Sequence, residues 1–88
     1  MKILKFGAIW CPGCLSMSKI WNDIVSNNDI EIEDYDIDFD EDICENYEIG
    51  DILPVYIFMD KDNNELERLI GEQKKEFLLS KIDQYRNE

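Results

Sequence analysis

The sequence of 88 residues contains no histidine. Because it also contains only three cysteines, the chain cannot by itself supply the four nitrogen or sulfur ligands of a usual structural zinc site. No apolar run approaches the roughly 18–20 residues that a membrane-spanning helix needs. Basic residues are scarce as well, since nine Lys and Arg stand against 21 Asp and Glu, for a net charge of -12. This charge repels phosphate backbones and anionic lipids, so we expect neither nucleic acid nor a membrane as a partner.

Cysteine is used sparingly and unevenly, with two of the three residues in one tight pair. An odd number does not match the even framework of a secreted disulfide scaffold, and it favours a reducing compartment. The first residues, "MKILKFGAIWC", hold an early lysine and only a short apolar run without a small-residue cleavage site, which is typical of mature sequence. We therefore expect a cytoplasmic, monomeric protein in which residues 1–88 form one domain around a modest core.

The hydrophobic pattern predicts seven elements in the order β-α-β-α-β-β-α. The expected strands cover residues 2–9, 30–37, 54–59 and 65–70, and the expected helices cover 12–25, 40–47 (capped by Asp40) and 72–85. The first strand is apolar, as expected in a sheet interior, whereas the second carries Glu31 and Glu33 on its polar positions, as expected at a sheet edge. A parallel strand-helix-strand unit followed by a hairpin predicts an α/β fold, with helices on both faces of a four-stranded mixed sheet.

The motif "WCPGC" lies where the first expected strand ends and the first expected helix begins. Cysteines as close as Cys11 and Cys14 hold a metal, form a structural cross-link or exchange electrons. At a helix N-terminus, unpaired N–H groups and the helix dipole stabilise a thiolate, and Pro12 suits the first helical turn. We expect Cys14, one turn further along, to be more buried and to keep its proton longer. This asymmetry predicts that Cys11 attacks a disulfide and Cys14 resolves the product, with Trp10 shielding the site and offering an apolar contact.

The strand, "WCPGC", the helix and the later "ILPVYIF" together resemble the thioredoxin superfamily over essentially the whole chain. The resemblance implies a thioredoxin-like fold and a thiol-disulfide oxidoreductase that reduces protein disulfides. It implies a reductase of the thioredoxin-reductase type as electron donor, and no cofactor. Pro54 then corresponds to a cis-proline that faces the cysteines and exposes the backbone of Leu53 to an extended substrate strand. Gly13 supports the site, and Gly71 corresponds to a family glycine near the active-site surface.

The chain also departs from the thioredoxin pattern. It begins directly at the strand before the cysteines, which gives it the size of a glutaredoxin or a minimal archaeal-type thioredoxin. Pro12-Gly13 replaces the usual Gly-Pro, and Val55 replaces a threonine. Lys5 stands six residues before Cys11, where thioredoxins usually hold a buried aspartate. A lysine there either stabilises thiolate and serves as a base, or simply reaches solvent at the strand end.

Other functions stay open at this point. A glutaredoxin-like protein would use glutathione, although an acidic surface does not favour that anion. Cys11 and Cys14 could also bridge a metal or a cluster between two subunits. Cys44, alone on a short helix, is expected to be a small core residue. Residues 36–42, "DIDFDED", begin like a calcium loop, but Glu41 takes the place of the required glycine, and we reject that site.

Overall fold

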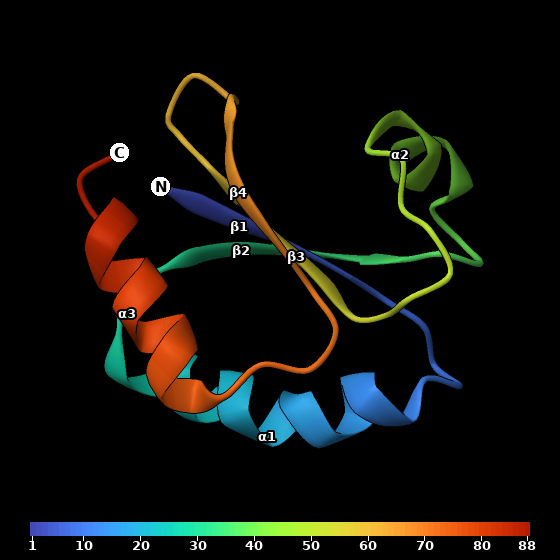
Figure 1. The fold of residues 1–88 in the computed structure, drawn as a ribbon, viewed down its shortest axis with the longest axis horizontal. Coiled ribbons are helices and arrows are strands. Elements are labelled where there is room, and N and C mark those ends of the chain that lie inside the picture. The colour runs from blue at the N-terminus through green and yellow to red at the C-terminus, as the bar shows by residue number, and fades with distance from the viewer.

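The computed structural model describes all 88 residues, and its elements follow the predicted order. They are β1 (Lys2–Gly7), α1 (Pro12–Asn27), β2 (Glu31–Asp36), α2 (Glu41–Asn46), β3 (Val55–Met59), β4 (Glu65–Ile70) and α3 (Lys75–Tyr85). The predicted fold class is confirmed, since the four strands form one mixed sheet in the order β2-β1-β3-β4. Helices α1 and α3 cover one face of this sheet, and α2 lies on the opposite face (Figure 1).

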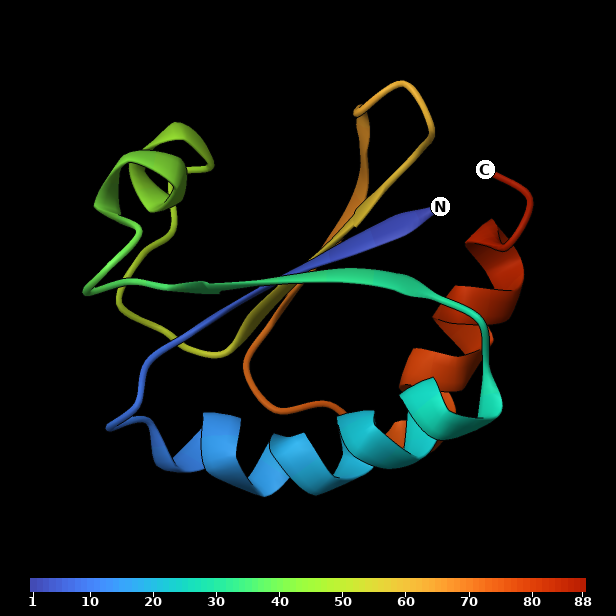
Figure 2. The same ribbon diagram turned by 180° about the vertical axis from the view of Figure 1, so that it is seen from behind.

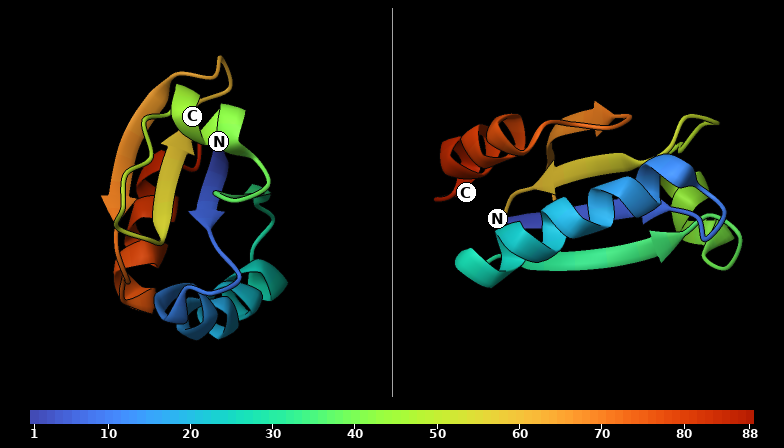
Figure 3. Two further views of the ribbon diagram at one scale, coloured as in Figure 1. Left: turned by 90° about the vertical axis from the view of Figure 1, so that its right-hand side faces the viewer. Right: turned by 90° about the horizontal axis from the view of Figure 1, so that it is seen from below.

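The sheet places β1 in the interior and β2 at an edge, as the sequence predicts. Strand β1 is parallel to β2 and antiparallel to β3, and β3 and β4 form the hairpin. Figure 3 shows these directions in its right-hand view, and Figure 2 brings the edge strand β2 to the front. The register places Lys5 of β1 between Asp34 of β2 and Tyr56 of β3, so that these three residues form one row across the sheet.

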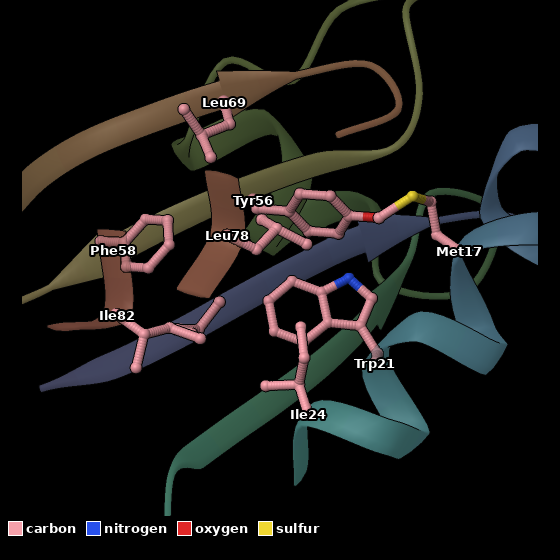
Figure 4. Packing of buried hydrophobic residues seen from close by; sticks show 9 residues of the cluster. Met17, Trp21, Ile24, Tyr56, Phe58, Leu69, Leu78 and Ile82 are labelled. Carbon is pink, nitrogen blue, oxygen red and sulfur yellow. The ribbon is translucent and has the colours of Figure 1, made fainter. Parts of the chain in front are cut away.

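Two cores lie on the two faces of the sheet because successive strand residues point to opposite sides. Below α1 and α3, nine buried residues form the larger cluster, most of which Figure 4 shows: Ile3, Met17, Trp21, Ile24, Tyr56, Phe58, Leu69, Leu78 and Ile82. Below α2, six residues form the smaller cluster: Leu4, Phe6, Cys44, Val55, Ile57 and Met59. Strand β3 contributes to both clusters, which explains why all five of its residues are buried.

Three details differ from the expected pattern. Leu15 and Val25, which the helical spacing of apolar residues over 12–25 groups with the inner face, are exposed, because the buried stripe of α1 runs through Met17, Trp21 and Ile24. Asp40 occupies the N-cap of α2 but makes no side-chain cap. Its Oδ2 instead accepts a hydrogen bond from the Asp36 N–H at 2.8 Å, which closes the loop that joins β2 to α2.

Burial predicts a large difference between two leucines of the helices. Leu78 of α3 is 0% exposed, so Leu78→Ala is expected to lower the free energy of unfolding by about 2–5 kcal/mol through lost contacts and a cavity. Leu15 of α1 is 64% exposed, and Leu15→Ala is expected to change it by no more than about 0.5 kcal/mol. Urea unfolding of both variants measures the difference, and equal losses would contradict this assignment of the core.

Candidate active site

The predicted site residues converge at the end of the sheet where β1 finishes and β3 begins. Strand β1 ends at Gly7 and α1 begins at Pro12, so the motif spans the end of the connecting turn and the first turn of α1. Pro54 immediately precedes β3, whose first residue, Val55, pairs with Phe6 of β1. The antiparallel register thus brings a segment forty residues away in sequence next to the cysteine pair.

Cys11 is the N-cap residue of α1, and Pro12 occupies the first turn. The Cys14 N–H donates a hydrogen bond to the Cys11 Sγ at 3.1 Å, and the Leu15 N–H donates to the Cys11 carbonyl at 3.2 Å. The sulfur therefore satisfies one of the free N–H groups of the first turn. No acidic residue lies in that turn to oppose a negative charge. The N–H and the helix dipole thus both point their positive ends at the Cys11 sulfur.

Cys14 lies half-buried on the same turn, with a thiol that holds its proton strongly. Burial is the largest cause that raises its pKa to about 11, and the hydrogen bond with the Cys11 side chain adds to it. The predicted order of burial is wrong, however, because Cys11 is only 4% exposed and is the more buried of the two. Cys14 stays partly exposed because it lines an open cavity that Cys11 does not line. Gly7 makes room for the Cys14 sulfur, since a Cβ atom there would come within 2.9 Å of the Sγ.

The Leu53–Pro54 peptide bond is cis, as the resemblance implies. The proline ring lies against the motif, since its Cδ is 3.4 Å from the position of a Cβ on Gly13. Neither backbone group of Leu53 makes a hydrogen bond within the protein, whereas the Pro54 carbonyl accepts one from the Gly71 N–H at 2.7 Å. Gly71 has a φ of 91°, a conformation that favours glycine. The structure therefore brings Leu53, Pro54 and Gly71 together beside Gly13.

Two carboxylates that the sequence analysis did not single out flank the motif. Trp10 is 62% exposed, and its Nε1 donates a hydrogen bond to the Asp38 Oδ2 at 2.9 Å. Glu72 accepts a hydrogen bond from the Ser16 hydroxyl at 2.6 Å, and its Cγ lies 3.2 Å from a Cβ position on Gly13. Glu72 could have been assigned to the site from the sequence, because it directly follows Gly71. No pattern in the sequence places Asp38 near Trp10.

A cavity of about 370 Å³ opens beside Cys14 and runs toward Lys5 and Tyr56. The Lys5 ammonium pairs with Asp34 at 3.2 Å and lies 5.1 Å from the centre of the Trp21 ring. Its side chain is only 22% exposed, so Lys5 lines the cavity rather than extending freely into solvent. Burial raises the pKa of Tyr56 to about 12, which keeps that hydroxyl neutral. The sequence indicated Lys5 as a candidate but gave no sign of the cavity.

Cys44 lies apart from this site, in the core cluster below α2, where burial raises the pKa of its thiol. No group of three or more cysteine and carboxylate side chains is arranged to hold a metal ion. None of the helices combines the length and the apolar character needed to cross a membrane.

Known proteins resemble the chain both in sequence and in structure. The family model described as Thioredoxin matches residues 1–84. A thioredoxin from Chlamydia pneumoniae is 30% identical over 84 residues, which cover 94% of this chain and 80% of that relative. Thioredoxin 1 from Thermosipho africanus superimposes with a TM-score of 0.84 at 26% identity, covering 98% of this chain and 94% of the other. Thioredoxin from Trypanosoma brucei brucei reaches 0.86 at 19% identity, covering 99% and 75%, and supports the fold alone.

The raised pKa of Cys14 predicts how stability depends on pH. In the unfolded chain the thiol ionises around its ordinary pKa of 9.0, whereas in the folded protein it ionises only near 11. Between these values the unfolded state binds fewer protons, so the stability contributed by the neutral thiol is complete below pH 9 and is lost toward pH 11. The reduced protein should lose more stability over this window than Cys14→Ser, as measured by urea unfolding. Equal losses would contradict the raised pKa.

Proposed function

This chain belongs to the thioredoxin family, and on that premise we propose that it reduces protein disulfides through a Cys11/Cys14 dithiol-disulfide cycle. The family and the fold support thiol-disulfide oxidoreductase activity in general. The observation that carries the finer proposal is the hydrogen bond of 3.1 Å from the Cys14 N–H to the Cys11 Sγ. It holds the two cysteines on one helical turn, with a sulfur at the helix N-terminus.

In the first step, the Cys11 thiolate attacks one sulfur of the substrate disulfide. The substrate S–S bond breaks, a mixed disulfide forms at Cys11, and the other substrate sulfur leaves as a thiolate. In the second step, Cys14 loses its proton and attacks the Cys11 sulfur, which expels the second substrate thiolate and forms the Cys11–Cys14 disulfide. Two electrons pass from the protein to the substrate. The high pKa of Cys14 fits the second role, because Cys14 stays protonated until a substrate is bound.

The surroundings of the motif support an extended protein segment as the substrate. The unpaired backbone groups of Leu53 are free to pair with a substrate strand, beside the ring of Pro54. Trp10 presents a large exposed apolar surface on the other side of Cys11. Glu72 and Asp38 flank the same surface, and their negative charges disfavour glutathione, which carries two carboxylates. A protein disulfide therefore fits this site better than a glutaredoxin substrate does.

The proposed cycle requires an electron donor, and we include in the proposal a reductase of the thioredoxin-reductase type. We further propose that residues 1–88 act as one domain and as a monomer in the cytoplasm. Both core clusters share the strands β1 and β3, which supports one cooperative unit.

Lys5 is proposed to assist the second step. It lines the same cavity as Cys14, and Asp34 and the Trp21 ring hold its ammonium group in place. A fixed positive charge in a partly buried site stabilises a thiolate as it forms, which speeds the attack of Cys14 on the mixed disulfide. Lys5 therefore acts indirectly: it does not contact the substrate, and it stabilises the negative charge that forms on the Cys14 sulfur.

A single-turnover assay with pre-reduced protein and insulin tests the cycle. Cys11→Ser is expected to lose the reaction entirely, because no thiolate remains at the helix N-terminus. Cys14→Ser should stop at a stable mixed disulfide with insulin, visible by mass spectrometry. Cys44→Ala is the matched control and should retain the wild-type rate, since Cys44 lies in the separate cluster below α2. A Cys11→Ser rate equal to that of the wild type would refute the proposal.

The role of Lys5 is tested by the pH dependence of the second step. Lys5→Met should slow resolution of the mixed disulfide about tenfold near neutral pH, equivalent to about 1.4 kcal/mol in activation free energy. It should also move the pH profile of that step upward, because the Cys14 thiolate loses its nearby cation. Lys5→Arg retains the charge and should restore the profile. An unchanged profile in Lys5→Met, with the fold intact, would rule out this role.

A further inference from the structure

Glu72 lies directly against the cysteine motif, although it belongs to the segment that joins β4 to α3. Its Cγ and Cδ lie 3.2 and 3.5 Å from the position of a Cβ on Gly13, and the Pro54 Cδ lies 3.4 Å from the same point. Figure 1 shows this segment passing beside α1. The Glu72 carboxylate therefore borders the surface that the proposed function gives to the substrate strand.

The Glu72 side chain is held in this position. Its Oε1 accepts a hydrogen bond at 2.6 Å from the hydroxyl of Ser16, which follows Gly13 by three residues on α1. The preceding residue fixes the backbone, because the Gly71 N–H donates to the Pro54 carbonyl at 2.7 Å. A carboxylate that is already ordered loses little side-chain freedom when a partner binds.

The negative charge of Glu72 has no counter-ion within the protein. Every ion pair joins other residues, and the Ser16 hydroxyl is neutral, so it positions the carboxylate without neutralising it. The Glu72 side chain is also exposed at the surface. The carboxylate is thus free to form a charge-assisted hydrogen bond with a cation that arrives with the substrate.

We propose that Glu72 makes the protein selective for disulfides whose cysteine has Lys or Arg as an immediate neighbour in the substrate. The proposal rests on the proposed function and names the substrate class of the same site. A substrate strand pairs with Leu53 while its cysteine meets Cys11. The residues beside that cysteine therefore pass over Gly13, where Glu72 lies. The carboxylate attracts a cationic neighbour and repels an acidic one.

The net charge of -12 attracts basic proteins in general, and Glu31 separates that effect from a local one. Glu31 is exposed, belongs to no ion pair and faces Lys2, at the end of β1 remote from the cysteines. From Lys2 to Gly7 the strand spans about 17 Å, roughly twice the Debye length of about 8 Å at physiological salt. Removing the Glu31 charge thus changes the net charge equally but leaves the field at the site nearly unchanged.

The kinetic test uses two disulfide-bridged peptides that differ only in the residues on both sides of each cysteine, which are Lys in one peptide and Glu in the other. Pre-reduced protein reduces each peptide in a single turnover at physiological salt. Each rate constant is divided by that of dithiothreitol, a neutral thiol, with the same peptide, which removes differences in intrinsic reactivity. The wild-type protein should reduce the Lys peptide about tenfold faster, or ~1.4 kcal/mol in activation free energy.

Glu72→Gln removes the charge and keeps the shape, because the amide oxygen still accepts the hydrogen bond from Ser16. The ratio of the two normalised rates should fall at least about threefold in this variant. Glu31→Gln is the matched control, since it makes the same substitution at the remote end of the sheet, and its ratio should equal that of the wild type. Equal ratios in Glu72→Gln and Glu31→Gln would overturn the proposal.

Salt provides a second readout, which a merely structural role of Glu72 would not move. Raising the ionic strength from about 0.15 M to about 1 M shortens the Debye length from about 8 to about 3 Å. The ratio should then fall in the wild-type protein and change much less in Glu72→Gln, whereas the same salt dependence in both would count against the proposal. If the wild-type protein reduces neither peptide, the proposed function fails. If it reduces both at equal normalised rates, only the selectivity fails.

Discussion

The hydrogen bond from the Cys14 N–H to the Cys11 sulfur is the interaction on which the site depends. It uses a donor that every helix leaves free in its first turn, and it fixes the spacing of the two cysteines through backbone geometry rather than through long side chains. The remaining contacts support this turn. Pro54 packs against Gly13, and the Gly71 N–H holds the Pro54 carbonyl, so three segments that are distant in sequence meet at one helix end.

Electrostatics divide this region into two environments. Asp38 and Glu72 are held by Trp10 and Ser16 on the outer surface, where they present negative charge to an approaching substrate. Lys5 lies inside, in the row that joins Asp34, Lys5 and Tyr56 across the sheet. Lys5, six residues before Cys11, is thus paired with Asp34 of the neighbouring strand, and both residues line the cavity beside Cys14.

Hydrophobic periodicity predicted the order of elements, the edge position of β2 and the fold class. An interior strand is apolar on both faces, whereas an edge strand carries acidic residues on its polar positions, so the two patterns differ. The convergence of Leu53, Pro54 and Gly71 on the cysteines required the family resemblance. What could not be predicted arises from packing between distant segments. Cys14 is partly exposed because it lines a cavity that residues from several segments form, and the carboxylates of Asp38 and Glu72 reach the motif through tertiary contacts alone.

A redox titration of the whole protein against defined ratios of reduced and oxidised dithiothreitol shows whether Cys11 and Cys14 form one redox-active pair. Peptide mapping of the oxidised form should accompany it. We expect one reversible two-electron transition, in which a monomer forms an internal disulfide between Cys11 and Cys14 while Cys44 remains a free thiol. Oxidation that links Cys44, joins two chains or leaves Cys11 and Cys14 unbridged would contradict it.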